Sequence, residues 1–263
     1  MKNHISIVVA VLILTSCEKN IDLTYKNNQS KIVIEGNISN EAGPYFVKIT
    51  RSVKLTETGS YPVVNDAIVS ISDNAGNSEI LTPQGNGVYQ CNTLTGIEGR
   101  TYTLEVQADG HAYTAQSTLP QRVSLDSVKV ETLSFTGETE YNLIPVYRDP
   151  DTTGNNYRFM VAVNGTLVDQ HLLQTDDVRN SQVNTQRLEI NNDDLELKPG
   201  DQVSIQMQCV DKNVALFYKT LVLMGDSGPG GGSTPNNPPS NISNGALGLF
   251  SAHTLETKSV LIP

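Results

Sequence analysis

The chain has 263 residues, and 18 Lys and Arg against 28 Asp and Glu give it a formal net charge of −10. This charge argues against nucleic-acid binding, which needs a cationic surface. Hydrophobic residues make up 38% of the chain, enough for one or two globular cores, so disorder throughout is excluded. Trp is absent, whereas Thr, Ser, Asn, Val and Ile are plentiful, which favours many short strands over helical bundles.

Residues 1–16 have the features of an export signal. Lys2 supplies a basic start, and residues 5–14 form an apolar run broken only by Ser6. As a helix this run would span about 15 Å, half of the roughly 30 Å hydrocarbon core of a bilayer, so it predicts a cleaved signal peptide and not a membrane span. Leu14-Thr15-Ser16-Cys17 is similar to the bacterial lipobox, whose Cys receives a diacylglyceryl group. We therefore expect Cys17 to be the lipidated first residue of the mature chain, anchored in the membrane by its acyl groups, which include palmitate.

After a polar tether over residues 17–30, residues 31–119 are predicted to form an immunoglobulin-like or transthyretin-like β-sandwich. The clearest strand covers residues 101–107, where Tyr102, Leu104 and Val106 alternate with polar residues. Asp109-Gly110 predicts a tight hairpin turn, because Gly tolerates the positive φ that such turns need. The other expected strands cover residues 31–35, 45–53, 67–72 and 111–118.

The pattern restarts after Leu119-Pro120, and residues 120–263 are predicted to form a second β-rich domain with one short helix. Asp211 is the expected N-cap of this helix and Gly225 its end. Residues 226–241 are rich in Gly and Pro and predict a long mobile loop. The apolar face of this helix is expected to consist of Val214, Phe217, Tyr218 and Leu221. The expected strands cover residues 127–134, 157–163, 167–173, 186–190, 202–210 and 254–262.

Gly225-Asp226-Ser227-Gly228-Pro229 is similar to the sequence around the nucleophile of chymotrypsin-like serine proteases. That chemistry needs a His to accept the Ser proton and an Asp to orient the imidazole. The histidines of the mature chain, His111, His171 and His253, lack the sequence context of such a base. A flexible linker is therefore favoured over a protease, and no catalytic residue is assigned.

Acidic side chains suggest two other sites. Residues 149–156 place oxygen ligands before Gly154, as in the first half of a calcium loop, but Met160 stands where an EF-hand needs a bidentate acid. A solvated turn whose Asp and Asn side chains bond the local backbone is favoured over calcium. The pairs Asp176-Asp177 and Asp193-Asp194 fit turns or helix caps better than glycosidase carboxylates. The residue spacings predict no zinc site, no phosphate-binding loop and no cofactor.

Two further cysteines, Cys91 and Cys209, are expected in an oxidising compartment, where pairing is possible. Cys209 continues the apolar alternation of Val203, Ile205 and Met207, and Cys91 lies in the other predicted domain. Buried free thiols are therefore favoured over a disulfide.

Several short motifs follow one another in a fixed order. They are Cys17-Glu18-Lys19, Ile21-Asp22-Leu23, Ile32-Val33-Ile34-Glu35-Gly36, Thr101-Tyr102-Thr103-Leu104, Ala108-Asp109-Gly110, Leu125-Asp126-Ser127, Asp149-Pro150, Asn156-Tyr157-Arg158-Phe159, Asn241-Ile242 and Gly245-Ala246-Leu247-Gly248-Leu249-Phe250. This order resembles the Bacteroidetes lipoprotein family catalogued as domain of unknown function 4249, over essentially the whole mature chain. Leu249 and Asn155 depart from the family pattern, which has aromatic residues there.

The resemblance implies an outer-membrane lipoprotein with an immunoglobulin-like first part, often encoded beside TonB-dependent receptors. It supplies no catalytic residues. Asp126-Ser127-Val128 and Asp151-Thr152-Thr153 also resemble the short O-glycosylation signal of these bacteria. The chain is therefore expected to be lipid-anchored in the outer membrane, on either its periplasmic or its outer face.

The expected function is that of a non-catalytic outer-membrane lipoprotein that binds a partner, as an accessory to a TonB-dependent nutrient transporter. The alternative is a surface glycan-binding protein or adhesin, for which a platform of Tyr or Phe rings would be expected. A hydrolase that uses Ser227 or the paired acids is a third hypothesis.

Overall fold

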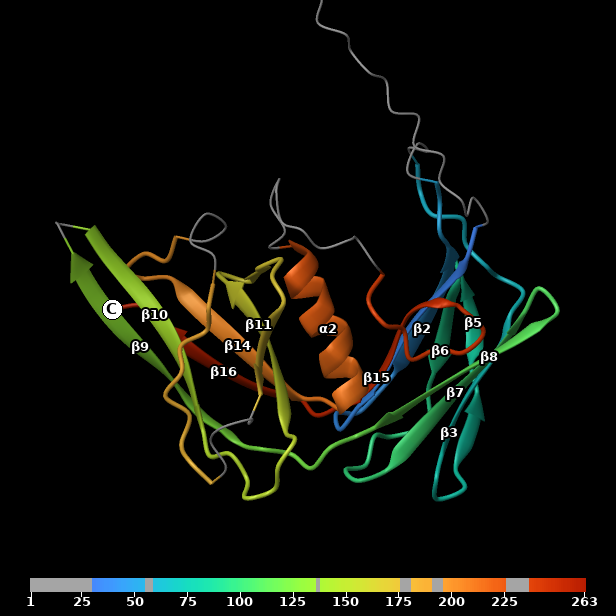
Figure 1. Cartoon of the computed structure of the whole chain (residues 1–263), viewed down its shortest axis with the longest axis horizontal. Coiled ribbons are helices and arrows are strands. Elements are labelled where there is room, and N and C mark those ends of the chain that lie inside the picture. Colours follow the sequence, from blue (N-terminus) through green and yellow to red (C-terminus); the bar gives the residue numbers. More distant parts are fainter. Residues whose placement is uncertain (1–29, 55–58, 136–137, 176–180, 191–195, 226–236) are drawn as a thin grey trace, which may run out of the picture.

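The computed structural model describes residues 30–54, 59–135, 138–175, 181–190, 196–225 and 237–263. Within these ranges the fold is mostly β, with sixteen strands and one helix, which confirms the predicted fold class. Figure 1 shows two groups of strands side by side, with helix α2 between them.

The first region is a sandwich of two sheets that share one core. One sheet has the strand order β15-β1-β2-β6-β5, and the other has the order β4-β3-β7-β8. Its strands are β1 (Ile32–Ser39), β2 (Tyr45–Arg51), β3 (Ile68–Asp73), β4 (Ser78–Ile80), β5 (Thr82–Gly85), β6 (Val88–Cys91), β7 (Thr101–Ala108), β8 (His111–Thr118) and β15 (Leu247–His253). A sandwich was the architecture that the sequence predicted for this region.

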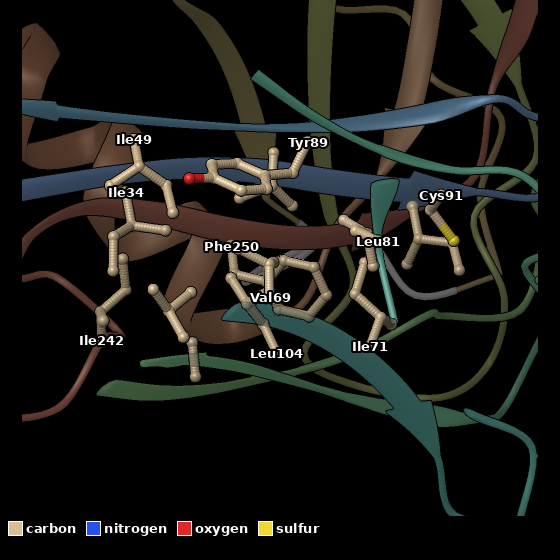
Figure 2. Close-up of a cluster of buried hydrophobic side chains, with 14 of the residues drawn as sticks. Ile34, Ile49, Val69, Ile71, Leu81, Tyr89, Cys91, Leu104, Ile242 and Phe250 are labelled. Atoms are coloured by element: carbon tan, nitrogen blue, oxygen red, sulfur yellow. The ribbon is translucent and has the colours of Figure 1, made fainter. Parts of the chain in front are cut away.

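Alternating apolar residues build the core of this sandwich. In β7, Tyr102, Leu104 and Val106 are buried, as the alternation predicts. Figure 2 shows side chains from both sheets facing one another, among them Tyr89 and Phe250 of one sheet and Leu104 of the other. Aromatic rings bury the largest apolar areas of any side chains, so these two make large contributions to the free energy of unfolding.

Strand β15 joins the first sandwich from the far end of the chain. It pairs in parallel with β1, from Val33↔Leu247 to Ser39↔His253, and Phe250 and Ala252 belong to the first core. This segment lies in the predicted second domain, at a place where no strand was expected. Parallel pairing between distant segments leaves no hairpin signal in the sequence. The division into two domains at Leu119-Pro120 stays a prediction, but the first core draws on residues from beyond it.

The second region packs a two-stranded ribbon, β10-β9, against a sheet in the order β12-β11-β14-β16, with β13 also paired to β11. Apolar residues of both layers, such as Leu125, Leu143, Phe159 and Ile205, form a second core. The strands are β9 (Leu125–Phe135), β10 (Glu138–Tyr147), β11 (Asn156–Val163), β12 (Thr166–Leu167), β13 (Leu172–Thr175), β14 (Gln202–Cys209) and β16 (Glu256–Leu261).

Two expected strands of the second region are wrong, and a third strand was missed. Strand β10 was not predicted, because polar residues and Pro145 obscure its alternation. Residues 167–173 are not one strand, since β12 ends at Leu167 and β13 begins at Leu172. Residues 186–190 form no strand, although the Leu188 amide donates to the Leu143 carbonyl at 2.8 Å, so the segment still runs beside β10.

Helix α2 (Lys212–Gly225) begins after Asp211 and ends at Gly225, as predicted. Asp211 Oδ1 accepts the amides of Asn213 at 2.8 Å and Val214 at 3.0 Å, which is the geometry of an N-cap. No helix in the described ranges is long and apolar enough to cross a membrane. Of the predicted loop over residues 226–241, the described part, residues 237–241, contains no helix or strand, and the remainder lies outside those ranges.

Candidate functional site

The two regions meet where β8, β15 and the first turn of α2 come together. Asp211 Oδ2 accepts the hydroxyl of Ser117 and, at 3.1 Å, the amide of Thr118, so the helix cap is also bonded to the end of β8. The same Ser117 hydroxyl oxygen accepts the Ala252 amide of β15 at 2.8 Å. This network fixes the start of α2 against the open side of the first sandwich.

A second link closes that open side. Asn241 donates to the Phe250 carbonyl at 2.7 Å and to the Gln116 carbonyl at 3.2 Å, and it accepts the Phe250 amide at 3.0 Å. One side chain thus joins β15 of one sheet to β8 of the other. Ser243 extends the contact, because its amide donates to the Thr114 carbonyl and its hydroxyl accepts the Thr114 amide, each at 2.8 Å. The backbone at the edge of β8 is therefore covered.

A groove of about 700 Å³ lies beside this junction. Two cross-strand pairs of β7 and β8, Thr103 with Gln116 and Glu105 with Thr114, line it on the sheet side. Asn213 and exposed Leu216 of α2 and residues 239–243 line the rest. Its volume is within the range of small-ligand and peptide sites.

The chemistry of the groove is that of neutral hydrogen bonding. Hydroxyl and amide side chains dominate, and Glu105 carries the one charge among the described lining residues. Those residues include no aromatic ring and no cation. The groove is therefore suited to uncharged or positively charged polar groups, such as backbone amides, hydroxyls and amines, and unfavourable for anions.

A different polar cluster lies beneath α2. The Arg158 guanidinium lies 4.1 Å from the ring centroid of Tyr218 and donates to Gln208 Oε1 at 2.9 Å. The His171 ring is 5.2 Å from that of Tyr218. Among the described residues no carboxylate forms an ion pair with Arg158. The Tyr218 ring and the Gln208 amide oxygen therefore stabilise its positive charge.

Burial and the nearby charge of Arg158 make both neighbouring histidines neutral. Burial, and after it the positive charge of Arg158, lower the pKa of His253 to about 4. Burial, followed by Arg158, also lowers the pKa of His171. Neither ring adds a positive charge to the cluster near neutral pH. This cluster packs α2 on the sheet. The candidate binding site is therefore the junction groove and not this cluster.

Among the described residues, the groove is lined by Asn241 and Ile242 of the family motif but by none of the histidines or cysteines singled out from the sequence. Cys17, Ser227, Asp176-Asp177 and Asp193-Asp194 lie outside the described residues. His111 is exposed on β8, whereas His171 and His253 lie near Arg158. Within the described ranges no three His, Cys, Asp or Glu side chains are grouped so that they could hold a metal ion.

Asn side chains of the turn at residues 149–156 bond the local backbone, as predicted. Asn155 donates to the Thr152 carbonyl at 2.6 Å, and Asn156 donates to the Gly154 carbonyl at 2.9 Å. Asp149 is buried and accepts the Tyr157 hydroxyl. Burial, together with this carboxylate, raises the pKa of Tyr157.

The two described cysteines are free and buried, as predicted. Burial and then the Glu79 carboxylate raise the pKa of the Cys91 thiol to about 12, and burial raises that of Cys209. Both are therefore inert thiols in the folded chain.

Sequence reasoning missed the groove itself. Its lining comes from β7, β8, α2 and residues 239–243, and ordinary Thr, Gln, Asn and Ser carry its chemistry. The local signal in the sequence was the set of polar alternate positions of β7, which include Thr103 and Glu105.

These features define a class: a mostly β protein with two cores, joined through a helix cap, and with a polar groove at the junction. The chain belongs to the family described as domain of unknown function (DUF4249), which it matches over residues 18–259. The resemblance drawn from the motifs is confirmed to that extent. No curated protein matches the chain.

Proposed function

We propose that this chain is a Bacteroidetes outer-membrane lipoprotein that binds a partner without catalysing a reaction, as an accessory to a TonB-dependent nutrient transporter. The observation that carries the binding role is the junction groove, with its neutral hydrogen-bonding lining. Such a lining can satisfy the amides and carbonyls of an extended polypeptide, and Glu105 offers a partner for a basic side chain. The groove is the site that receives a segment of the partner.

The anchor is supported by the apolar run before Leu14-Thr15-Ser16-Cys17. The family match begins at residue 18, directly after this Cys. Mass spectrometry of the protein from its natural membrane tests this part. The expected result is a chain that begins at Cys17 and carries diacylglyceryl and further acyl mass, whereas an unmodified Cys17 would refute the anchor.

The binding role is tested by co-purification from detergent-solubilised outer membranes. Wild type is expected to recover a TonB-dependent transporter in stoichiometric amount. Gln116→Arg is expected to reduce the recovery at least tenfold, a loss of about 1.4 kcal/mol, because the longer side chain fills the groove and its guanidinium competes with the partner for Glu105. Gln84→Arg is the matched control, since Gln84 is also exposed but lies on β5. Equal recovery with both variants would remove the groove from the interaction.

A surface glycan binder is the second candidate, because hydroxyl and amide side chains also hydrogen-bond sugars. The described lining lacks the aromatic platform expected for such a site. A glycan array decides between the two: binding that is lost in Gln116→Arg and kept in Gln84→Arg would favour the glycan role.

A further inference from the structure

The structure shows where the chain that follows Cys17 joins the fold. The Ser30 hydroxyl donates to the Ser52 carbonyl at 2.6 Å, and the Lys31 amide donates to the Ser52 hydroxyl at 2.9 Å. The Ser52 amide in turn donates to the Lys31 carbonyl at 2.8 Å. The described chain therefore begins at the end of β2, where the tether predicted over residues 17–30 ends.

Two exposed hydrophobic residues lie at the same end. The Arg51 amide donates to the Pro62 carbonyl at 2.8 Å, and Thr50 forms an isolated bridge with Val63. This places Tyr61 and Val63 directly beside the tether junction. Tyr61 is 62% exposed and Val63 is 43% exposed.

The composition of this end is that of a membrane interface. Lys31 and Lys54 are also exposed at this end, since Lys31 bonds Ser52 and Lys54 follows Ser52 by two residues. We call Lys31, Lys54, Tyr61 and Val63 the tether-end patch. Tyr is enriched at the headgroup level of bilayers because its ring is apolar and its hydroxyl polar, and Lys is attracted to anionic lipid. Figure 1 shows that α2 also ends on the side of the molecule at which β1 begins, and its exposed Leu223 belongs to that last turn.

The tether is long enough to allow this end of the sandwich to touch the membrane, but its length does not require that contact. Ser30 is 13 residues after Cys17, a stretch that reaches at most about 45 Å when fully extended. The net charge of −10 opposes adsorption of the molecule in arbitrary orientations. A contact therefore depends on a local patch that presents apolar and basic groups next to the anchor.

We propose that the tether-end patch rests on the phospholipid surface, so that the first sandwich stands with the end of β2 against the membrane. This inference rests on the proposed lipid anchor. It orients the molecule: the start of β2, at the far end of that strand, points away from the bilayer. The occupant of the patch is the lipid headgroup region and not a protein partner.

The absence of Trp from the chain makes a direct test possible. Tyr61→Trp places a single indole in the patch. Phe46→Trp is the matched control, because Phe46 is also an exposed aromatic residue, at 46%, and lies about 20 Å away along β2. Each full-length, lipidated variant is incorporated into vesicles of phosphatidylethanolamine and phosphatidylglycerol, with or without lipids brominated on their acyl chains.

Brominated lipid is expected to remove about half of the indole emission of Tyr61→Trp and to leave that of Phe46→Trp unchanged, because bromine quenches only indoles at the interface. If the variants float with the vesicles but neither indole is quenched, or both are quenched equally, the oriented contact is refuted while the anchor stands. A patch reserved for a protein partner would give the first of these results. If the variants do not float with vesicles, like a Cys17→Ser control, the anchor fails and the contact fails with it.

Discussion

The two regions place their charged groups in different ways. In the first sandwich, carboxylates lie at strand ends and accept backbone amides: Glu79 accepts the amides of Asn92, Thr93 and Leu94 at 2.6 to 3.0 Å. In the second region, α2 covers a polar sheet face on which Arg158 is held by a ring and an amide. Where two sheets meet face to face, charges are confined to the periphery and hold turns in place. Where a helix covers a sheet, a charge is retained under it.

Asp73 follows the first pattern. Its carboxylate accepts hydrogen bonds from the Ala75 amide at 3.0 Å and the Asn77 amide at 2.9 Å, and it forms an ion pair with the Arg100 guanidinium at 2.6 Å. Burial by itself would raise the pKa of Asp73, but the bonds from Asn77, Arg100 and Ala75 outweigh it and lower the pKa to about 2. The charge therefore stabilises the turn between β3 and β4.

The largest effect is expected where β15 closes the first core. Gly248 has φ +99°, and a Cβ there would lie 2.0 Å from the Ile34 carbonyl oxygen. Gly248→Ala is expected to lower the free energy of unfolding by about 3 kcal/mol, since strained backbone and a clash with β1 add together. Gly245→Ala is the control, because φ is +70° with nothing near the added Cβ, and about 1 kcal/mol is expected. Urea unfolding followed by circular dichroism measures both, and equal losses would contradict the close approach.

The next effect is expected at the link between the regions. Asp211→Ala removes the N-cap of α2 and the bonds to Ser117 and Thr118, so a loss of about 2 kcal/mol is expected. Asp211→Asn keeps a good N-cap, and its loss is expected to be about 1 kcal/mol smaller. The same unfolding measurement applies. If neither variant lost a measurable free energy of unfolding, the link would contribute nothing to stability.

Glu79 makes the first pattern depend on pH. Burial raises its pKa, but hydrogen bonds from Asn92, Thr93 and Leu94 outweigh burial and lower the pKa from 4.5 to about 2. A carboxyl whose folded pKa lies below its unfolded pKa stabilises the fold above the unfolded pKa, and this contribution is lost as pH falls. Glu79→Gln is expected to cost about 1.5 kcal/mol at pH 7, and the difference from wild type is expected to shrink between pH 5 and pH 2.

This difference in the free energy of unfolding is measured from unfolding curves of Glu79→Gln and wild type across the same pH range. Glu35→Gln is the control, because Glu35 is exposed on β1 of the same sandwich, and its effect is expected to stay below about 0.5 kcal/mol. A difference for Glu79→Gln that stays constant down to pH 2 would contradict the carboxylate's role.

The smallest effect is expected in the second region. Arg158→Met replaces the side chain with a shorter, unbranched apolar one, so the desolvation cost of the charge and its interactions with Tyr218 and Gln208 disappear together. The free energy of unfolding is expected to change by less than about 1 kcal/mol. A loss comparable to that of Gly248→Ala would mean that this charge stabilises its region as strongly as β15 stabilises the first.

The sequence predicted what depends on local pattern. Tyr102, Leu104 and Val106 showed the inward face of β7, and Asp211 and Gly225 marked the ends of α2. It failed where the partner is distant, as in β15, or where polar residues and Pro145 interrupt alternation, as in β10. The groove could not be predicted, because Asn241 and Gln116 meet only after both sheets are complete.

The position of β15 also affects how the polypeptide reaches its folded state. Residues of β1 leave the ribosome early, yet their neighbour in the sheet is synthesised near the end. Until then the edge of β1 offers unsatisfied amides and carbonyls to any passing strand. Pairing of β15 with β1 closes a very long loop of chain, and such closure is slow. The early segments of this chain therefore stay unpaired, and open to misassociation, until its last segments have been synthesised.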